Sequence, residues 1–284
     1  MDLQVRLQQL REKAREMQPS LGERLDRMRV GVPARGAPTA EALAASLGGN
    51  VVAPGLIEIV RTYALPFRHG EVTVRHAGVL GDTAKSLLKL ATPVAPESLL
   101  YLDTETTGLA GGTGTVAFMV GFGWIENRSL RIAQWLLAGF AAEHALVATV
   151  RERLARAGVI VSFNGKSFDL PLLKTRARLA GAELSTDGLA HLDLLHVTRR
   201  LLHAGWRDCR LRTAEAQALR LERTDDLPGA EAPAAWRRWL ERGDASLLGH
   251  VADHNRADLL ALVALMALLE RPTQREAPLL HAAR

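Results

Sequence analysis

Two carboxylates, Asp103 and Glu105, lie two positions apart in the segment LDTETTGL, directly after the apolar residues of a predicted buried strand. Side chains at positions i and i+2 of a strand emerge on one face, so both acids point toward one place. A carboxylate is costly to bury unless it is paired or bound to a cation. This spacing therefore indicates a site for a divalent metal ion.

Two further acids and a histidine follow at positions that could join this pair. Asp169 opens a predicted helix just after a short apolar strand. Asp258 lies on the last long helix, and His254 precedes it by four residues, on the same face and one turn away. Acids from three separate elements and one histidine can therefore converge at the edge of a sheet.

Several segments resemble a known superfamily. In this order, DTETTGL, SFNGKSFDLPLL and HNRADLLAL resemble the three exonuclease motifs of the DEDD superfamily, whose members have an RNase H-like fold. YALPFRHGEVTVRH upstream and HLDLLHVTRRLLHAGWRDCRLRTAEAQ downstream resemble its YprB-like branch, so the likeness covers roughly residues 50–270. We therefore expect an α/β fold: an RNase H-like mixed β-sheet flanked by helices, with an N-terminal helical/β-ribbon extension.

The resemblance also implies a reaction and a cofactor. It indicates metal-dependent 3′-5′ exonuclease action on single-stranded nucleic acid, DNA more than RNA, with release of nucleoside 5′-monophosphates. Two Mg²⁺ or Mn²⁺ ions ~3.5–4 Å apart can neutralise charge at both the attacking and the leaving oxygen, and both ions suit oxygen ligands. The same family context implies DNA repair or nucleic-acid processing, with a helicase as a partner.

Each acid takes a role from this resemblance. Asp103 would bridge both ions. Glu105 and Asp258 would complete the site that holds the attacking water, and Asp169 would anchor the ion near the leaving group. His254 would orient and deprotonate the water, a task suited to a group that titrates near neutrality.

The position of the histidine departs from the family pattern. Relatives with a catalytic histidine usually place it five positions before the last aspartate, whereas relatives with a tyrosine use a four-position offset. His254 occupies the four-position offset, and Asp253 stands in the usual histidine slot. His250 lies on the same helical face two turns before Asp258 and is the alternative base.

The resemblance places contacts to the terminal nucleotide at Thr106, Gly108, Leu109, Asn164 and Phe168. Each contact has a structural alternative, because residues 106–109 could form a simple turn and Phe168 could belong to the core. Asp193 could support the site from behind or only cap a helix.

Two further patterns carry less information. Seven arginines against three acids lie from Arg199 to Arg223; arginine suits phosphate contact, but a charged run on a helix is usually a solvated face. The GKS of residues 165–167 lacks the earlier glycine of a phosphate-binding loop, since Ile160 stands there. A nucleoside triphosphatase of that type is therefore excluded.

The elements that must position these residues follow from hydrophobic periodicity. LLYLDTETT, TVAFMVGFGWIE and LRIAQWLLA predict three sequential strands in a meander. A helix over AAEHALVATVRERLARAG should end at Gly158, followed by the strand VIVSFN and a helix that opens near Asp169. The remainder reads as helices over HLDLLHVTRRLLHAG, RLRTAEAQALRL and PAAWRRWLERG, with a final one from about residue 244 to 270. This order fits a mixed sheet with helices on its faces.

Three parts are expected along the chain. Residues 1–95 form an N-terminal extension with an amphipathic helix over about 1–30, a linker, and a hairpin or ribbon over 51–80. Residues 96–272 form the exonuclease domain, and residues 273–284 a flexible C-terminal tail.

Composition sets outer limits on function. Lys and Arg outnumber Asp and Glu by 36 to 31, a mild excess that permits a nucleic-acid partner. The single cysteine, Cys209, excludes an internal disulfide framework and a cysteine-rich zinc site. The N-terminal segment lacks the apolar core of a signal peptide, and the run Leu259–Leu269 is too short to span a bilayer. We therefore expect a cytoplasmic protein with no membrane partner.

Three other functions share most of these features. An exoribonuclease that trims RNA 3′ ends would use the same metal ligands and differ in contacts to the 2′-hydroxyl. A nucleic-acid-binding module with a decayed active site would bind a strand without cutting it. A structure-selective endonuclease would apply the same metal chemistry within a strand.

Overall fold

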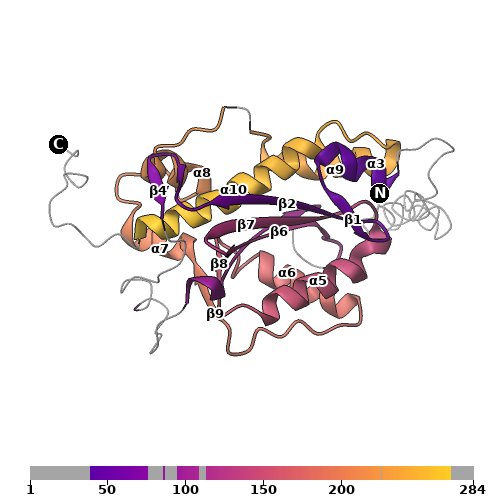
Figure 1. The fold of residues 1–284 in the computed structure, drawn as a ribbon, viewed down its shortest axis with the longest axis horizontal. Coiled ribbons are helices and arrows are strands. Elements are labelled where there is room, and N and C mark those ends of the chain that lie inside the picture. Colours follow the sequence, from indigo (N-terminus) through magenta and orange to yellow (C-terminus); the bar gives the residue numbers. More distant parts are fainter. Residues whose placement is uncertain (1–38, 76–85, 87–94, 109–112, 225, 270–284) are drawn as a thin grey trace, which may run out of the picture.

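The computed structural model describes residues 39–75, 86, 95–108, 113–224 and 226–269. Within these residues, seven strands form one sheet in the order β1-β2-β7-β6-β5-β8-β9, and two short strands form a separate ribbon. Helices lie on both faces of the sheet: α10, α9 and α3 on one side, α5 and α6 on the other (Figure 1). The predicted helix over residues 1–30, Leu109 and the predicted tail over 273–284 fall outside the described residues.

The main sheet is mixed, as the sequence predicts. Its strands are β1 (Asn50–Ala53), β2 (Leu56–Ala64), β5 (Leu99–Thr106), β6 (Ala117–Glu126), β7 (Ser129–Leu137), β8 (Val159–Ser162) and β9 (Ala190–Asp193). The predicted meander is confirmed, because β5, β6 and β7 pair antiparallel in chain order. β8 runs parallel to β5, and β9 runs parallel to β8. The first seven residues of β6 are buried, which is typical of a central strand covered by helices on both faces.

The ribbon expected over residues 51–80 is present as two hairpins with different partners. β1 and β2 pair antiparallel, and β2 continues the main sheet by pairing along its whole length with β7. β3 (Phe67–His69) and β4 (Val72–Val74) form the separate two-stranded ribbon. The main sheet therefore takes strands from both sides of the domain boundary predicted at residue 95.

The helices are α3 (Ala40–Leu47), α5 (Glu143–Ala155), α6 (Asp169–Leu179), α7 (Leu194–Leu201), α8 (Leu211–Ala214), α9 (Ala232–Arg242) and α10 (Leu248–Leu269). One π-helical turn, Glu215–Leu219, continues α8. No helix in the described part of the chain has the length and apolar character needed to cross a membrane.

Two local predictions are wrong. The helix predicted to end at Gly158 ends at Ala155, and the N–H of Gly158 instead donates to the carbonyl oxygen of Ser98 at 2.7 Å. The helix predicted to begin at His191 is preceded by strand β9, which pairs with β8 through His191 and Ile160. Pairing at the sheet edge thus overrides the helical periodicity of this segment.

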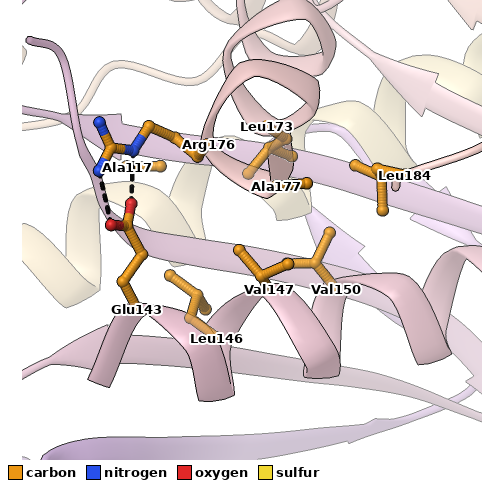
Figure 2. Close-up of a pocket in the computed structure, with 9 residues that line it drawn as sticks. All are labelled: Ala117, Glu143, Leu146, Val147, Val150, Leu173, Arg176, Ala177 and Leu184. Carbon is orange, nitrogen blue, oxygen red and sulfur yellow. Dashed lines mark hydrogen bonds and ion pairs between the residues drawn. The ribbon is translucent and has the colours of Figure 1, made fainter. Parts of the chain in front are cut away.

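Helices α5 and α6 pack together below the sheet, and their contact also holds a loop near the end of β5. Figure 2 shows the guanidinium of Arg176 paired with the carboxylate of Glu143 at the side of a small apolar cavity of about 10 Å³. The Nη1 of Arg176 donates to the carbonyl oxygen of Thr113 at 2.8 Å. This ion pair therefore ties both helices to the segment that leads into β6.

Helix α10 lies against the opposite face of β5 and β6, and a glycine permits its close approach. Asn255 of α10 is fully buried, and its Oδ1 accepts from the Nε2 of Gln134 at 2.9 Å. The same Nε2 donates to the carbonyl oxygen of Ala252 at 2.7 Å. A Cβ added at Gly121 would lie 2.2 Å from the Asn255 Oδ1. Residue 121 must therefore be glycine for α10 to sit at this depth.

We predict that Gly121→Ala destabilises the protein by about 1–3 kcal/mol, because the new methyl group displaces Asn255 and with it α10. Gly139→Ala is the matched control, since a Cβ there meets nothing within 4 Å and its φ of −174° is ordinary extended backbone. Urea denaturation followed by circular dichroism measures both variants. Equal stability of the two variants would show that α10 does not depend on the glycine.

Candidate active site

Asp103 and Glu105 lie on one face of β5, the face that α10 covers. Asp103 is paired with Gly121 on β6, and residues directly opposite each other in a sheet share a face. The Nδ2 of Asn255 donates to the Oδ2 of Asp103 at 2.6 Å. Glu105 is buried, whereas Asp103 keeps partial exposure. The strand thus delivers both acids toward α10, as their spacing predicts.

Asp169 approaches from the other helical layer. It is the first residue of α6, reached through a short loop from the end of β8, which runs parallel to β5. Its Oδ1 accepts a hydrogen bond from the Oγ1 of Thr104 on β5. A Cβ at Gly165 would lie 2.4 Å from the Oγ of Ser162 and 3.1 Å from the Oδ2 of Asp169. The loop therefore needs glycine at 165 to bring Asp169 against β5.

Asp258 and His254 come from α10, one turn apart. The Nε2 of His254 is 3.8 Å from the Oδ2 of Asp258. The other oxygen of Asp258, Oδ1, is 2.6 Å from the Nη2 of Arg223. Asp258 thus faces an imidazole on one oxygen and a guanidinium on the other.

The pKa values of the acids reflect their common location. Burial raises the pKa of Asp103 well above its usual range, and the charges of Asp258, Asp169 and Glu105 raise it further. Burial, followed by the charges of Asp258 and Asp169, does the same to the pKa of Glu105. Because charges act strongly on a pKa only over short distances, the four acids of the three motifs lie together.

The pKa values of Asp169 and Asp258 are also raised, and neighbouring groups that lower them can be named for each. Burial raises the pKa of Asp169 to about 6, against the lowering effect of the Thr104 hydroxyl. Burial raises the pKa of Asp258 as well, while Arg223 and His254 act in the opposite direction. All four acids therefore have raised pKa values, which a nearby cation would lower.

The donor set consists of carboxylates, whose hard oxygen atoms are ligands that magnesium and manganese prefer. Neighbouring carboxylates raise the pKa of Asp103 and Glu105 beyond the effect of burial, and a bound cation would act against both effects. As the side chains stand, no group of three or more His, Cys, Asp or Glu residues in the described part of the chain is arranged to hold a metal ion. Mg²⁺ commonly retains water and takes substrate phosphate as a ligand, so protein groups need to supply only part of its coordination.

A cavity of about 200 Å³ opens beside the acids, and most of the predicted substrate contacts line it. Its walls include Asp103 and Asp169 together with four of those five contacts: Thr106, Gly108, Asn164 and Phe168. Phe168 is 50% exposed, so the alternative that it belongs to the core is wrong. Leu109 lies outside the described residues.

Asp193 supports one wall of this cavity and also caps α7. Its Oδ1 accepts from the backbone N–H of Asn164 at 2.7 Å and of Leu195 at 3.0 Å. Its Oδ2 accepts from the N–H of Lys166 at 3.1 Å. Asn164 is held with a φ of 68°, which is uncommon for a residue other than glycine. Both alternatives raised for Asp193 from the sequence therefore apply together.

Of the base candidates, His254 lies closest to the acids. Its Nδ1 is 2.6 Å from the Oδ1 of Asp226. His250 is exposed on α10, two turns before Asp258. Asp253, in the usual histidine slot, is 64% exposed and pairs with Arg256 at 2.9 Å. The geometry favours His254 over His250.

Three residues at the site were missed by sequence reasoning. Asn255 stands beside His254 in the third motif, and its one-turn spacing from Asp258 was the available signal. Arg223 ends the run that the sequence left open between phosphate contact and a solvated face, and its side chain is 10% exposed and contacts Glu215 and Asp258. Asp226 belongs to none of the three motifs, and only the folded chain brings it to His254.

Comparisons with known proteins place the chain in a family. The family model described as RNase_H superfamily matches residues 100–270. A protein of Bacillus subtilis (strain 168), the uncharacterized protein YprB, is 34% identical over 169 residues, which are 59% of this chain and 41% of that protein. The chain thus spans about two fifths of the length of this curated relative.

Solved structures with lower similarity were also found. A family B DNA polymerase from Pyrobaculum calidifontis has a TM-score of 0.45 at 18% identity, covering 80% of this chain and 33% of the polymerase. The E. coli ExoI–ssDNA complex in its zinc-bound form has a TM-score of 0.41 at 15% identity, covering 62% of this chain and 41% of ExoI.

The family model covers more than half of the chain. The predicted family and fold class are confirmed: this chain belongs to the RNase H superfamily and is similar to YprB.

Proposed function

We propose that this protein is a metal-dependent nuclease that removes nucleotides from the 3′ end of single-stranded nucleic acid, with DNA preferred over RNA. The observation that carries the proposal is the meeting of four acids from β5, α6 and α10 beside a cavity of about 200 Å³. Membership of the RNase H superfamily supports the same class of reaction. The polarity and the 5′-monophosphate product are taken from the family resemblance.

Two Mg²⁺ or Mn²⁺ ions are the cofactor that this donor set supports. When bound, such ions neutralise charge on the attacking and the leaving oxygens of a phosphodiester. Asp103 would hold both ions. Glu105 and Asp258 would hold the ion on the side of the attacking water, and Asp169 the ion on the side of the leaving group.

The other side chains act on the water and on the strand. His254 accepts the proton of the attacking water at Nε2, the nitrogen that faces Asp258. The terminal nucleotide occupies the cavity, where the exposed ring of Phe168 offers a stacking surface for a base. Thr106, Gly108 and Asn164 line the same space and limit where the sugar and phosphate can lie.

Timed digestion of end-labelled oligomers, single- and double-stranded, DNA and RNA, with and without Mn²⁺, tests the proposal. We expect metal-dependent shortening of single-stranded DNA from its 3′ end. Faster shortening of RNA would favour the exoribonuclease, and binding without cutting would favour a decayed module. Linearisation of a circular single strand would identify an endonuclease.

We predict that Asp103→Asn lowers the cleavage rate by about 100-fold or more, because the variant loses the carboxylate assigned to both ions. Asp253→Asn is the matched control because it makes the same substitution at an aspartate outside the site. Asp253 is exposed and pairs with Arg256. Initial rates on a single-stranded DNA oligomer with Mn²⁺ measure both. A wild-type rate for Asp103→Asn would overturn the metal assignment.

The acid cluster also predicts how stability depends on pH. A carboxyl group with a raised folded-state pKa contributes stability below its unfolded pKa, and that contribution is lost as pH rises through the folded value. Metal-free Asp103→Asn should therefore melt at a higher temperature than wild type at about pH 7.5, with a smaller difference near pH 5. Mn²⁺ should raise the melting temperature of wild type more than that of the variant. Thermal melts with EDTA or Mn²⁺ check this, and a variant less stable at both pH values contradicts it.

We predict that His254→Ala slows cleavage by about 10²- to 10⁴-fold while Mn²⁺ binding is largely kept, as expected on loss of a general base. His250→Ala should cleave at nearly the wild-type rate, because His250 is exposed. Steady-state rates, with Mn²⁺ binding followed by calorimetry, separate the two. A larger loss in His250→Ala would reverse the assignment of the base.

A helicase partner, a role in DNA repair and a cytoplasmic location stay predictions. Unpaired 3′ ends are the substrate that this proposal requires, and a helicase would supply them. The described residues add no observation that favours one partner over another.

A further inference from the structure

The segment between the π-helical turn and α9 contacts the face of α10 that carries His254 and Asp258. Three of its residues do so: Arg223 pairs with Asp258, Asp226 contacts His254, and Gly229 lies close to the imidazole ring. The three acidic motifs of the sequence do not include this segment. Its contacts are nevertheless made with the two α10 residues to which the chemistry is assigned.

Asp226 holds one nitrogen of the His254 ring. Its Oδ1 lies 2.6 Å from Nδ1, and the side chains of Asp226 and His254 are 9% and 18% exposed. A carboxylate accepts hydrogen bonds and does not donate them, so Nδ1 carries the hydrogen in this pair. In the neutral ring, Nε2 then carries the lone pair, and it lies on the side of Asp258, 3.8 Å from its Oδ2.

The space in front of Nε2 is kept open by Gly229. A Cβ added there would lie 3.4 Å from Nε2. Any larger side chain would extend further toward the nitrogen.

The side chain of Arg223 contacts both Asp226 and Asp258. The Nη1 of Arg223 donates to the Oδ2 of Asp226 at 3.3 Å, and its Nη2 pairs with Asp258 at 2.6 Å. Nη2 also donates to Glu215, which is 1% exposed on the π-helical turn, at 2.7 Å. One buried guanidinium therefore fixes the distance between the carboxylate that orients the imidazole and the carboxylate beside Nε2.

We propose that Asp226 is a positioning residue that fixes the tautomer and ring orientation of His254, so that Nε2 is the proton acceptor. This inference rests on the proposed function. It accounts for a histidine at the four-position offset, because the ring takes its orientation from a residue outside the acidic motifs. Asp226 acts through His254 and contacts neither the substrate nor the reacting water.

The first test observes the imidazole directly and needs no activity. Long-range ¹H–¹⁵N correlation spectra of metal-free protein with labelled histidine report which ring nitrogen carries the hydrogen, and His254→Ala assigns the signal. We expect the Nδ1–H form in wild type and its loss in Asp226→Ala. Asp226→Asn should keep it, because the amide oxygen can still accept from Nδ1. An unchanged tautomer in Asp226→Ala overturns the proposal.

The second test uses kinetics of the full chain with Mn²⁺ and a single-stranded DNA oligomer. Asp226→Ala should lower kcat by roughly 10- to 100-fold with little change in KM, and Asp226→Asn should recover part of the loss. In a His254→Ala background, Asp226→Ala should cost nothing more, because the group it positions is absent. A further loss in that background, or a loss confined to KM, overturns the proposal.

Two controls separate this inference from the proposed function. Asp253→Ala, an exposed acid on the same helix, should leave kcat and tautomer unchanged, and thermal melts show whether each Asp226 variant is folded. If no variant or wild-type protein cleaves any oligomer, the proposed function fails while the tautomer result still stands. If cleavage is robust but insensitive to Asp226, the positioning role alone fails.

Discussion

The burial of several carboxyl groups close together is the constraint on which this structure depends. Burial and neighbouring charge both raise the pKa of Asp103 and Glu105, so bringing the acids together is unfavourable unless other forces hold them in place. The holding force is apolar packing. β5 is fixed between β6 and β8, and α10 buries a long run of leucine, alanine and valine against the same sheet. The fold thus stabilises an arrangement that the acids alone would disrupt.

One hydrogen bond joins each of the two helices α10 and α6 to β5 at an acid of the cluster. Asn255 donates to Asp103 from α10, and Thr104 donates to Asp169 of α6 from β5. Arg223 contacts Asp258 from a connection outside either layer. These contacts orient the carboxyl groups of the cluster before any substrate binds.

Prediction from sequence succeeded where the signal was local. The strand of Asp103 and Glu105 and the helix that Asp169 opens follow from apolar runs and spacing, and the meander follows from three such runs in succession. It failed where long-range pairing decided the outcome. His191 reads as part of a helix but joins β9, because β8 offers a free parallel edge there. Composition could not reveal which arginine of the run from 199 to 223 turns inward, since its partners Glu215 and Asp258 are brought to it only by folding.

The pairing of β2 with β7 bears on how the chain can be divided. β2 hydrogen-bonds to β7 over nine residues, from Leu56 opposite Leu137 to Ala64 opposite Ser129. A fragment that begins at residue 96 would leave β7 as an unprotected edge, with its backbone groups open to pairing with another copy. Such a fragment would be prone to self-association even though it keeps every acid of the cluster. Strand β2 therefore protects this edge of β7, and a fragment that keeps the edge paired must include Leu56–Ala64.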